Sequence, residues 1–195
     1  NSRQPNSRWY TGSGIYRDVN LLIGNDVYIP RNGVRITTLS ASDEIAVVEV
    51  CAEVKNIIGY GVEAECKFEI RHDGEIVAKE LQKVIIQSDS KETIRVKMPV
   101  LNPVKWSVES PELYQCIIQT RIDGRVCDTD SFCFGIRTLA LDPVNGFQLN
   151  GETINLRGAC IHHDNGIIGA ETFFSTELYR CKRLKEAGFN ALRSV

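Results

Sequence analysis

The amino-acid sequence predicts a mainly β fold, in which an immunoglobulin-like antiparallel β-sandwich occupies residues 31–138 and a strand–helix–strand unit follows it. Apolar and polar residues alternate through the middle of the chain, as in strands with one buried face. Asp-Gly pairs separate some of these runs, and a helical period appears only near the end. Strands that recur about every 10 to 15 residues between turn signals are typical of a sandwich of roughly seven strands.

The segment before residue 31 is interpreted as the end of a preceding domain. It contains the run WYTGSGIYR at 9–17 and the apolar run VNLLI at 19–23. A single terminal strand cannot form a sheet by itself, so this strand needs partners earlier in the protein. The aromatic cluster is expected to fill a domain seam, and the alternative is a loop that stacks on a sugar ring.

The clearest strands of the sandwich are residues 48–55 and 93–98. One face of each is apolar and the other is polar, the apolar positions being Val48, Val50, Ala52, Val54, Ile94, Val96 and Met98. Asp73-Gly74 and Asp123-Gly124 predict two tight hairpin turns. The Cys-Trp-Cys spacing of antibody domains is absent, because no cysteine pair is correctly placed about Trp106.

The last part of the chain predicts a right-handed β/α/β crossover. Alternating runs flank Asn150-Gly151, which predicts a hairpin followed by a strand from Ile154 to Ala159. Ser175 is expected to cap a helix and Gly188 to end it. Residues 189–192 form an apolar run that is typical of a parallel strand covered on both sides.

Polar side chains follow both strands of this predicted crossover. His162, His163 and Asp164 follow the first strand, and Arg193 follows the second. Functional groups of parallel β/α folds gather at the carboxyl ends of the strands, so these residues are expected on one edge. The alternative is that the histidines are ordinary loop residues and Arg193 is a surface cation. No metal site is assigned, because adjacent loop side chains rarely converge on one ion.

Composition limits the partners and the compartment. The net charge of −2 provides no basic field for nucleic acid, and no run approaches the ~18 apolar residues of a membrane span. The chain begins without an initiator Met or a charged-then-apolar leader, so targeting cannot be read from it. The seven cysteines are odd in number, and Cys66 and Cys116 are in phase with buried positions. Free buried thiols favour a reducing, cytoplasmic location.

Three motifs in the chain resemble glycoside hydrolase family 2, the family of β-galactosidases, β-glucuronidases and β-mannosidases. The run at 9–17 is similar to the end of that family's N-terminal jelly-roll domain. The runs WSVESPELY at 106–114 and FGIR at 134–137 resemble the closing half of its immunoglobulin-like domain. FQLNG at 147–151, LRG at 156–158 and NALR at 190–193 look like the entry to its catalytic (β/α)8 barrel. The resemblance implies domains at 1–30, 31–138 and 139–195, the last being a truncated start of the barrel.

The resemblance implies a retaining glycosidase as the parent protein. One carboxyl group protonates the leaving oxygen, and a second, about 5 to 5.5 Å away, attacks the anomeric carbon. The family takes both glutamates from later barrel strands, one of them in an Asn-Glu pair. No catalytic residue is therefore assigned here, and the chain alone is expected to be inactive. Glu171, Glu177 and Glu186 lie in or near the predicted helix, on the outside of a barrel, and are not candidates.

The resemblance assigns His162 to substrate binding and Arg193 to support of the catalytic carboxylates, with Asp164 as a further candidate for contact with substrate. The chain departs from the family pattern at His163-Asp164, where many β-galactosidases carry Glu-His, and at Val195. These departures leave the sugar open: β-galactosidase is preferred, and β-glucuronidase and β-mannosidase are alternatives. An alternative from another class is a non-catalytic sandwich module that binds carbohydrate or a protein partner.

The remaining expectations also come from the resemblance. The partner is a β-glycoside or oligosaccharide, and the parent is expected to be a homo-oligomer without nucleic-acid or membrane contacts. No cofactor is expected in this chain, whereas the parent is a candidate for Mg²⁺ or Na⁺.

Overall fold

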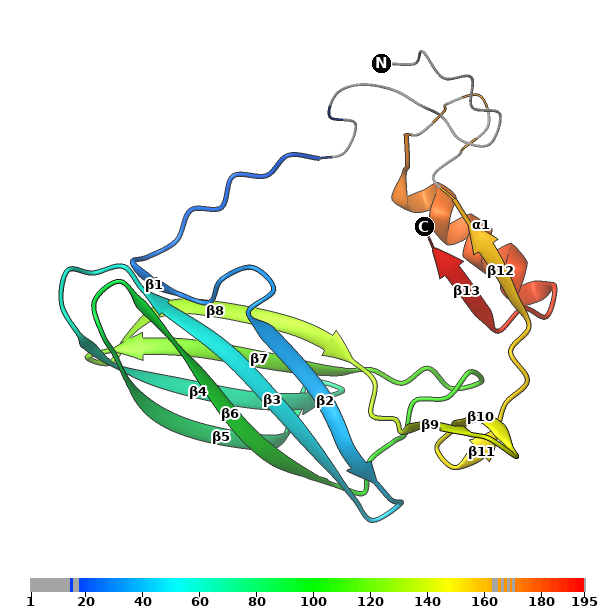
Figure 1. The fold of residues 1–195 in the computed structure, drawn as a ribbon, viewed down its shortest axis with the longest axis horizontal. Coiled ribbons are helices and arrows are strands. Elements are labelled where there is room, and N and C mark those ends of the chain that lie inside the picture. Colours follow the sequence, from blue (N-terminus) through cyan, green and yellow to red (C-terminus); the bar gives the residue numbers. More distant parts are fainter. Residues whose placement is uncertain are drawn as a thin grey trace. The chain divides into compact units, whose positions relative to one another are not determined.

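The computed structural model describes residues 15, 18–162, 165, 167, 169 and 171–194. Packing divides the chain into two compact units, one from Ile23 to Ile154 and another that contains the residues from Asn155 onward. The first unit is built of antiparallel strands, and the second contains the helix α1 (Figure 1). The prediction of a mainly β chain built on antiparallel sheets is confirmed.

The first sheet of the larger unit is organised around one long strand. β3 (Ile45–Asn56) pairs along its whole length with β6 (Ser90–Leu101). Its other edge pairs with β2 (Val34–Ala41) and, at the end of β3, with the short β1 (Val27–Tyr28). β1 therefore joins a strand of the sandwich, although the sequence assigned residues 27–28 to the preceding domain.

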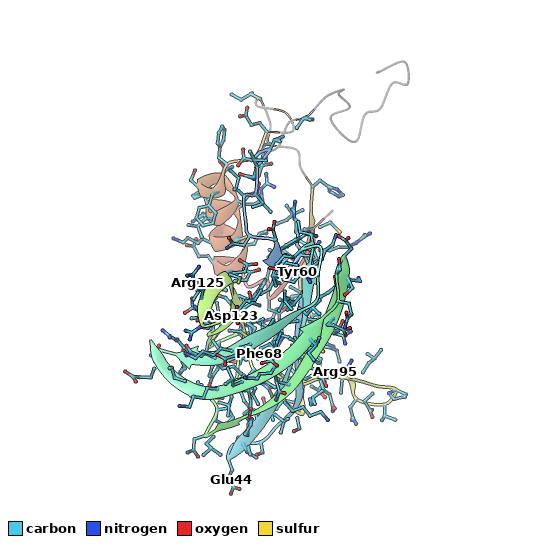
Figure 2. The ribbon with its side chains drawn as sticks, turned by 90° about the vertical axis from the view of Figure 1, so that its left-hand side faces the viewer. Glu44, Tyr60, Phe68, Arg95, Asp123 and Arg125 are labelled. Atoms are coloured by element: carbon cyan, nitrogen blue, oxygen red, sulfur yellow. The ribbon has the colours of Figure 1, made fainter. Side chains whose placement is uncertain are left out.

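The second sheet has the order β5-β4-β7-β8, with every pair antiparallel. Its strands are β4 (Val62–His72), β5 (Glu75–Ile86), β7 (Tyr114–Ile122) and β8 (Arg125–Phe134). The β2–β3 turn at Glu44 lies at one end of the sandwich, and the turns at Tyr60 and Asp123 lie at the other (Figure 2). The predicted hairpins at Asp73-Gly74 and Asp123-Gly124 are confirmed, since all four residues have positive φ.

The core lies between the two sheets. It is formed mainly by the inward positions of β3, β4, β6 and β7, and Phe68, Ile70, Met98 and Ile118 are fully buried there. Every apolar position predicted for 48–55 and 93–98 is buried, because alternate residues of a strand point to the same face. Cys66 and Cys116 are also fully buried, as their phase predicted. Desolvation in the core raises the pKa of each thiol to about 12.

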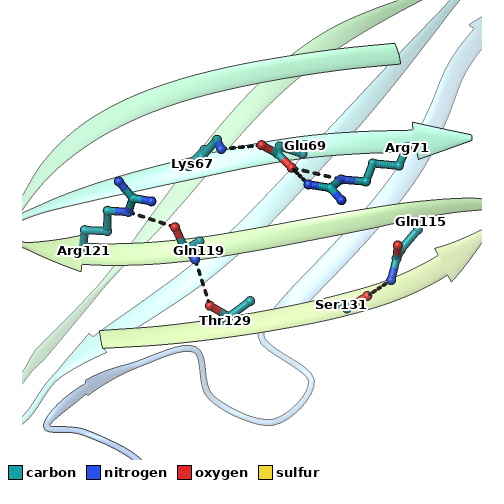
Figure 3. Close-up of polar contacts among 8 residues, drawn as sticks. All are labelled: Lys67, Glu69, Arg71, Gln115, Gln119, Arg121, Thr129 and Ser131. Carbon is teal, nitrogen blue, oxygen red and sulfur yellow. Dashed lines mark hydrogen bonds and ion pairs between the residues drawn. The ribbon is translucent and has the colours of Figure 1, made fainter. Parts of the chain in front are cut away.

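The outer face of the second sheet carries polar side chains that are joined by hydrogen bonds and ion pairs. Glu69 is only 4% exposed on this face because it contacts Lys67 and accepts hydrogen bonds from Arg71, the shorter at 2.6 Å (Figure 3). The hydrogen bonds from Lys67 and Arg71 hold the pKa of the Glu69 carboxyl below its usual range. Gln119 accepts from Arg121 and donates to Thr129, linking β7 to β8.

A small three-stranded sheet follows the sandwich. It consists of β9 (Leu139–Asp142), β10 (Gly146–Leu149) and β11 (Glu152–Thr153). The Asn150-Gly151 turn between β10 and β11 has positive φ at both residues, as predicted. The Asn150 side chain accepts from the Thr138 N–H and donates to the Trp106 carbonyl, each at 3.0 Å. This amide therefore ties the small sheet to the long loop between β6 and β7.

The second unit is a strand–helix–strand unit with parallel strands. β12 (Gly158–Ile161) pairs with β13 (Ala191–Ser194), and α1 (Phe174–Glu186) lies between them in sequence. Gly188 has φ +87° and its N–H bonds the Lys185 carbonyl, which confirms the predicted helix end. The prediction that Ser175 caps the helix is wrong. The cap is Phe173, which offers no side-chain acceptor, and Ser175 lies inside the first turn.

The strand predicted from Ile154 to Ala159 is also misplaced. Glu152–Thr153 completes the hairpin, residues 154–157 form no strand, and β12 begins at Gly158. The break occurs because Asn155 and Arg157 direct their backbone groups to the side chain of Asn190.

All seven cysteines lie within the described part of the chain and are free thiols. No helix among the described residues has both the length and the apolar content required to cross a bilayer.

Candidate functional site

The candidate site is the edge at which β12 and β13 end. The two strands are parallel and in register, with Cys160 beside Arg193 and Ile161 beside Ser194. Their carboxyl ends therefore meet at one edge. His162 directly follows β12 and is partly buried, whereas Arg193 is exposed within β13. Arg193 was expected just after its strand, and it lies one residue before the strand's last position.

Alternation separates the two faces of this pair of strands. Ala159 and Ile161 are half-buried, whereas Cys160 and Arg193 are exposed, which indicates that the first two point toward the helix. Cys160 and His162 also border the hollow between β12 and α1. Cys160 and its neighbour Arg193 belong to the opposite set of side chains, because successive residues of a strand point to opposite faces. Arg193 thus lies on the face turned away from α1. In a β/α barrel this is the inner face of the strands, and the active site lies at their carboxyl ends.

The amino ends of the strands are locked together by two polar residues. The Asn190 side chain accepts from the Arg157 N–H at 2.7 Å and donates to the Asn155 carbonyl at 3.0 Å. The Asn190 N–H bonds the Arg157 carbonyl at 3.0 Å, and Nε of Arg157 donates to the Gly188 carbonyl at 3.0 Å. These bonds fix the register of β12 and β13. The register in turn sets where His162 and Arg193 lie.

The loop after β12 is held by a residue of the helix. Arg180 donates to the His162 carbonyl at 3.3 Å and also contacts the side-chain oxygen of Asn165. Glu177, one helical turn earlier, forms an ion pair with Arg180 at 3.5 Å. Sequence reasoning did not identify Arg180, because its helical position gives no sign of a contact with a loop 15 to 18 residues away.

The hollow between β12 and α1 has a volume of about 600 Å³. Its lining is mainly apolar and includes Tyr179 and Leu184 of α1. It lies on the helix side of the strands, whereas Arg193 lies on the other side. We interpret the hollow as space for a packing neighbour of the helix. It offers no carboxylate for glycosyl transfer, since none of its lining residues is acidic.

The other predicted site residues have different outcomes. Asp164 and His163 lie outside the described residues. Glu177 and Glu186 lie on α1 in ion pairs with Arg180 and Arg183. Among the described residues, no group of three or more His, Cys, Asp or Glu side chains is placed to hold a metal ion.

Comparison with known proteins gives one consistent family. The family model described as "Glycosyl hydrolases family 2" matches residues 27–137. A putative β-glucuronidase from Formosa agariphila is 32% identical over 99% of this chain, which spans 18% of that protein. A β-galactosidase from Bacteroides ovatus is 30% identical over 99% of this chain and 23% of its own length.

A crystal structure gives the same result at the level of the fold. A glycosyl hydrolase family 2 member from Bacteroides cellulosilyticus is 38% identical and superimposes with a TM-score of 0.93. The match covers 98% of this chain and 27% of that one. The chain therefore spans about a fifth to a quarter of the relatives it matches.

Proposed function

Because this chain belongs to glycosyl hydrolase family 2, we propose that the longer protein of which it is a part hydrolyses β-glycosides with retention of configuration. The substrate we propose is a β-galactoside. One observation carries the proposal: within a chain of this family, two parallel strands in register bring His162 and Arg193 to one edge. Active sites of β/α barrels lie at the carboxyl ends of the strands, and there a retaining glycosidase of this fold would hold its two carboxyl groups.

Each residue of this edge has a defined role in the proposal. The His162 imidazole is partly buried, and it can donate a hydrogen bond to a hydroxyl of the sugar that is cleaved. The Arg193 guanidinium lies near the carboxylates that later strands supply, where its charge favours their ionised form. Asp164, on the same loop as His162, is proposed to contact the substrate. The nucleophile and the general acid come from outside this chain, so the chain alone is expected to be inactive.

The domain plan follows the same proposal. Residues up to 26 end a jelly-roll domain, residues 27–138 form the immunoglobulin-like sandwich, since β1 pairs with β3, and residues 139–195 begin the (β/α)8 barrel. The helix supports the last assignment, since α1 has no buried residue and Phe174 is 84% exposed. The apolar side chains that α1 leaves exposed are ones that neighbouring elements of a barrel would cover.

A direct test compares the 195-residue chain with the longer protein on p-nitrophenyl β-galactoside. We expect hydrolysis by the longer protein and none by the chain. Turnover by the chain itself would refute the assignment of both catalytic carboxyl groups to other strands. Failure of the longer protein to cleave any β-glycoside would refute the proposed reaction.

β-Glucuronidase is a second candidate activity, because a relative with that name is 32% identical to the chain and the β-galactosidase is 30% identical. The same assay with p-nitrophenyl β-glucuronide separates the two candidates. A higher kcat/KM for the glucuronide would replace β-galactoside as the substrate and leave the mechanism unchanged.

A further inference from the structure

One edge of the sandwich, beside β2 and the end of β8, contains a hollow of about 520 Å³. It lies between β2 and the end of β8, which are edge strands of the two sheets. Thr37 and Thr38 line it on one side, and Phe134, Arg137 and Leu139 line it on the other. All of these residues belong to the compact unit from Ile23 to Ile154.

The guanidinium of Arg137 is held in place by an aromatic ring. Its central carbon lies 4.4 Å from the centroid of the Trp106 ring, a cation–π arrangement. The backbone of Trp106 is fixed, because its backbone N–H donates to the Ile136 carbonyl at 2.9 Å and its carbonyl accepts from the Asn150 side chain at 3.0 Å. Gly135 allows this close packing, since a Cβ at that position would lie 2.8 Å from the tryptophan side chain.

The charge of Arg137 is available for a ligand. The side chain is exposed, and no ion pair joins it to a carboxylate of the described residues. A guanidinium that stacks on a ring through its face keeps its N–H donors at the edge, where they match the two oxygens of a carboxylate. The hollow therefore contains the Arg137 guanidinium in a fixed orientation, and no carboxylate of the described residues pairs with it.

The rest of the lining favours a sugar as the carrier of that carboxylate. Thr38 pairs with the buried Val48, so its hydroxyl is on the same face as Phe134 and can donate to or accept from a sugar hydroxyl. Thr37 points to the opposite face. Phe134 and Leu139 provide apolar surface, on which the faces of pyranose rings pack. The volume lies within the range of small-molecule sites.

We propose that this hollow binds a uronic acid residue of a glycan, with the carboxylate on Arg137 and the ring between Thr38 and Phe134. No covalent step takes place there, and the hollow retains a carboxylated glycan on the sandwich. The choice of a sugar among carboxylates rests on the proposed function. The anion site itself rests only on Arg137 and its surroundings.

The test is a binding titration of the 195-residue chain with D-glucuronate, D-glucose and acetate, followed by the indole N–H signal of Trp106 in NMR spectra. Saturable binding of glucuronate is expected, at least tenfold tighter than that of glucose or acetate. Arg137→Gln should weaken glucuronate binding at least tenfold. The matched control Arg125→Gln, an exposed arginine at the start of β8, should leave it unchanged.

Equal affinity for glucuronate and glucose would overturn the proposal, as would an Arg137→Gln chain that binds like the original. Acetate binding as tightly as glucuronate would exclude a sugar site. If Arg137→Gln does not fold, phenylglyoxal modification of the unaltered chain gives the answer. Glucuronate, and not glucose, should slow the modification of Arg137, and equal rates would refute the site. Hydrolysis enters none of these measurements, so a failure here is distinct from a failure of the proposed function.

Discussion

Asn56 is predicted to be the polar side chain on which the sandwich depends most. It is the last residue of β3 and is fully buried. Its side-chain nitrogen lies 2.9 to 3.1 Å from the carbonyls of Tyr60, Ile86 and Gln87, and its oxygen accepts from the Ile58 N–H at 2.8 Å. One amide thus joins the end of a strand in the first sheet to the β3–β4 loop and to the end of β5 in the second sheet.

Asn56→Ala removes all four contacts. The two N–H hydrogens share three carbonyls, so the amide makes about three full hydrogen bonds, and about 1 kcal/mol for each gives a loss of about 3 kcal/mol in the free energy of unfolding. Urea unfolding followed by tryptophan fluorescence measures this loss. Gln82→Ala is the control, because Gln82 is an exposed amide on β5, and the change should cost less than about 0.5 kcal/mol. A loss below about 1 kcal/mol for Asn56→Ala would contradict the inference that this amide links the two sheets.

Three further predictions concern charge, thiols and register. Folding lowers the pKa of Glu69, so its contribution to stability is present above about pH 4.3 and is lost as the pH falls toward the folded pKa. Between pH 6 and pH 3, the urea midpoint of the unaltered chain should therefore fall more than the midpoint of Glu69→Gln. Glu44→Gln is the control, and its midpoint should follow the unaltered chain over the same pH range. Iodoacetamide at pH 8 should label Cys133 in the native chain and leave Cys66 unlabelled by mass spectrometry, since Cys133 is exposed and burial raises the pKa of Cys66 to about 12. Asn190→Ala should destabilise the pairing of β12 with β13 by about 1 to 2 kcal/mol, and it should speed hydrogen exchange of the Arg157 backbone N–H about tenfold.

Each of these predictions has a contradicting result. If Glu69→Gln follows the same pH dependence as the unaltered chain, its neighbours do not stabilise the charged form. Labelling of Cys66 at the rate of Cys133 would mean that the core opens readily. Unchanged exchange in Asn190→Ala would show that the register of β12 and β13 is set by other contacts.

The sandwich was predictable because its signals are local. In residues 48–55 and 93–98, apolar side chains recur at every second position, and burial on one face of a sheet demands that period. Asp-Gly and Asn-Gly turns are readable for a similar reason, since few dipeptides tolerate two positive φ angles. The buried Glu69 was not predicted, because its burial depends on Lys67, Arg71 and the neighbouring strands together.

The candidate site was predictable in position and less so in detail. The rule that strand ends carry function places His162 and Arg193 at one edge, and the parallel pairing has that geometry. The start of β12 and the cap of α1 were misplaced, because Asn190 and Phe173 act through contacts that no local pattern reveals. The Arg137–Trp106 contact joins residues 31 positions apart, so only the folded chain shows it.

The central claim is that the β12–β13 edge forms part of the substrate site of a retaining glycosidase. Its most direct test is kcat/KM of the longer protein carrying Arg193→Gln, with Arg125→Gln as the control. We expect a loss of roughly 100-fold or more for Arg193→Gln and no change for the control, because the change removes a cation beside catalytic carboxylates. An Arg193→Gln enzyme that retains full kcat/KM would contradict the claim.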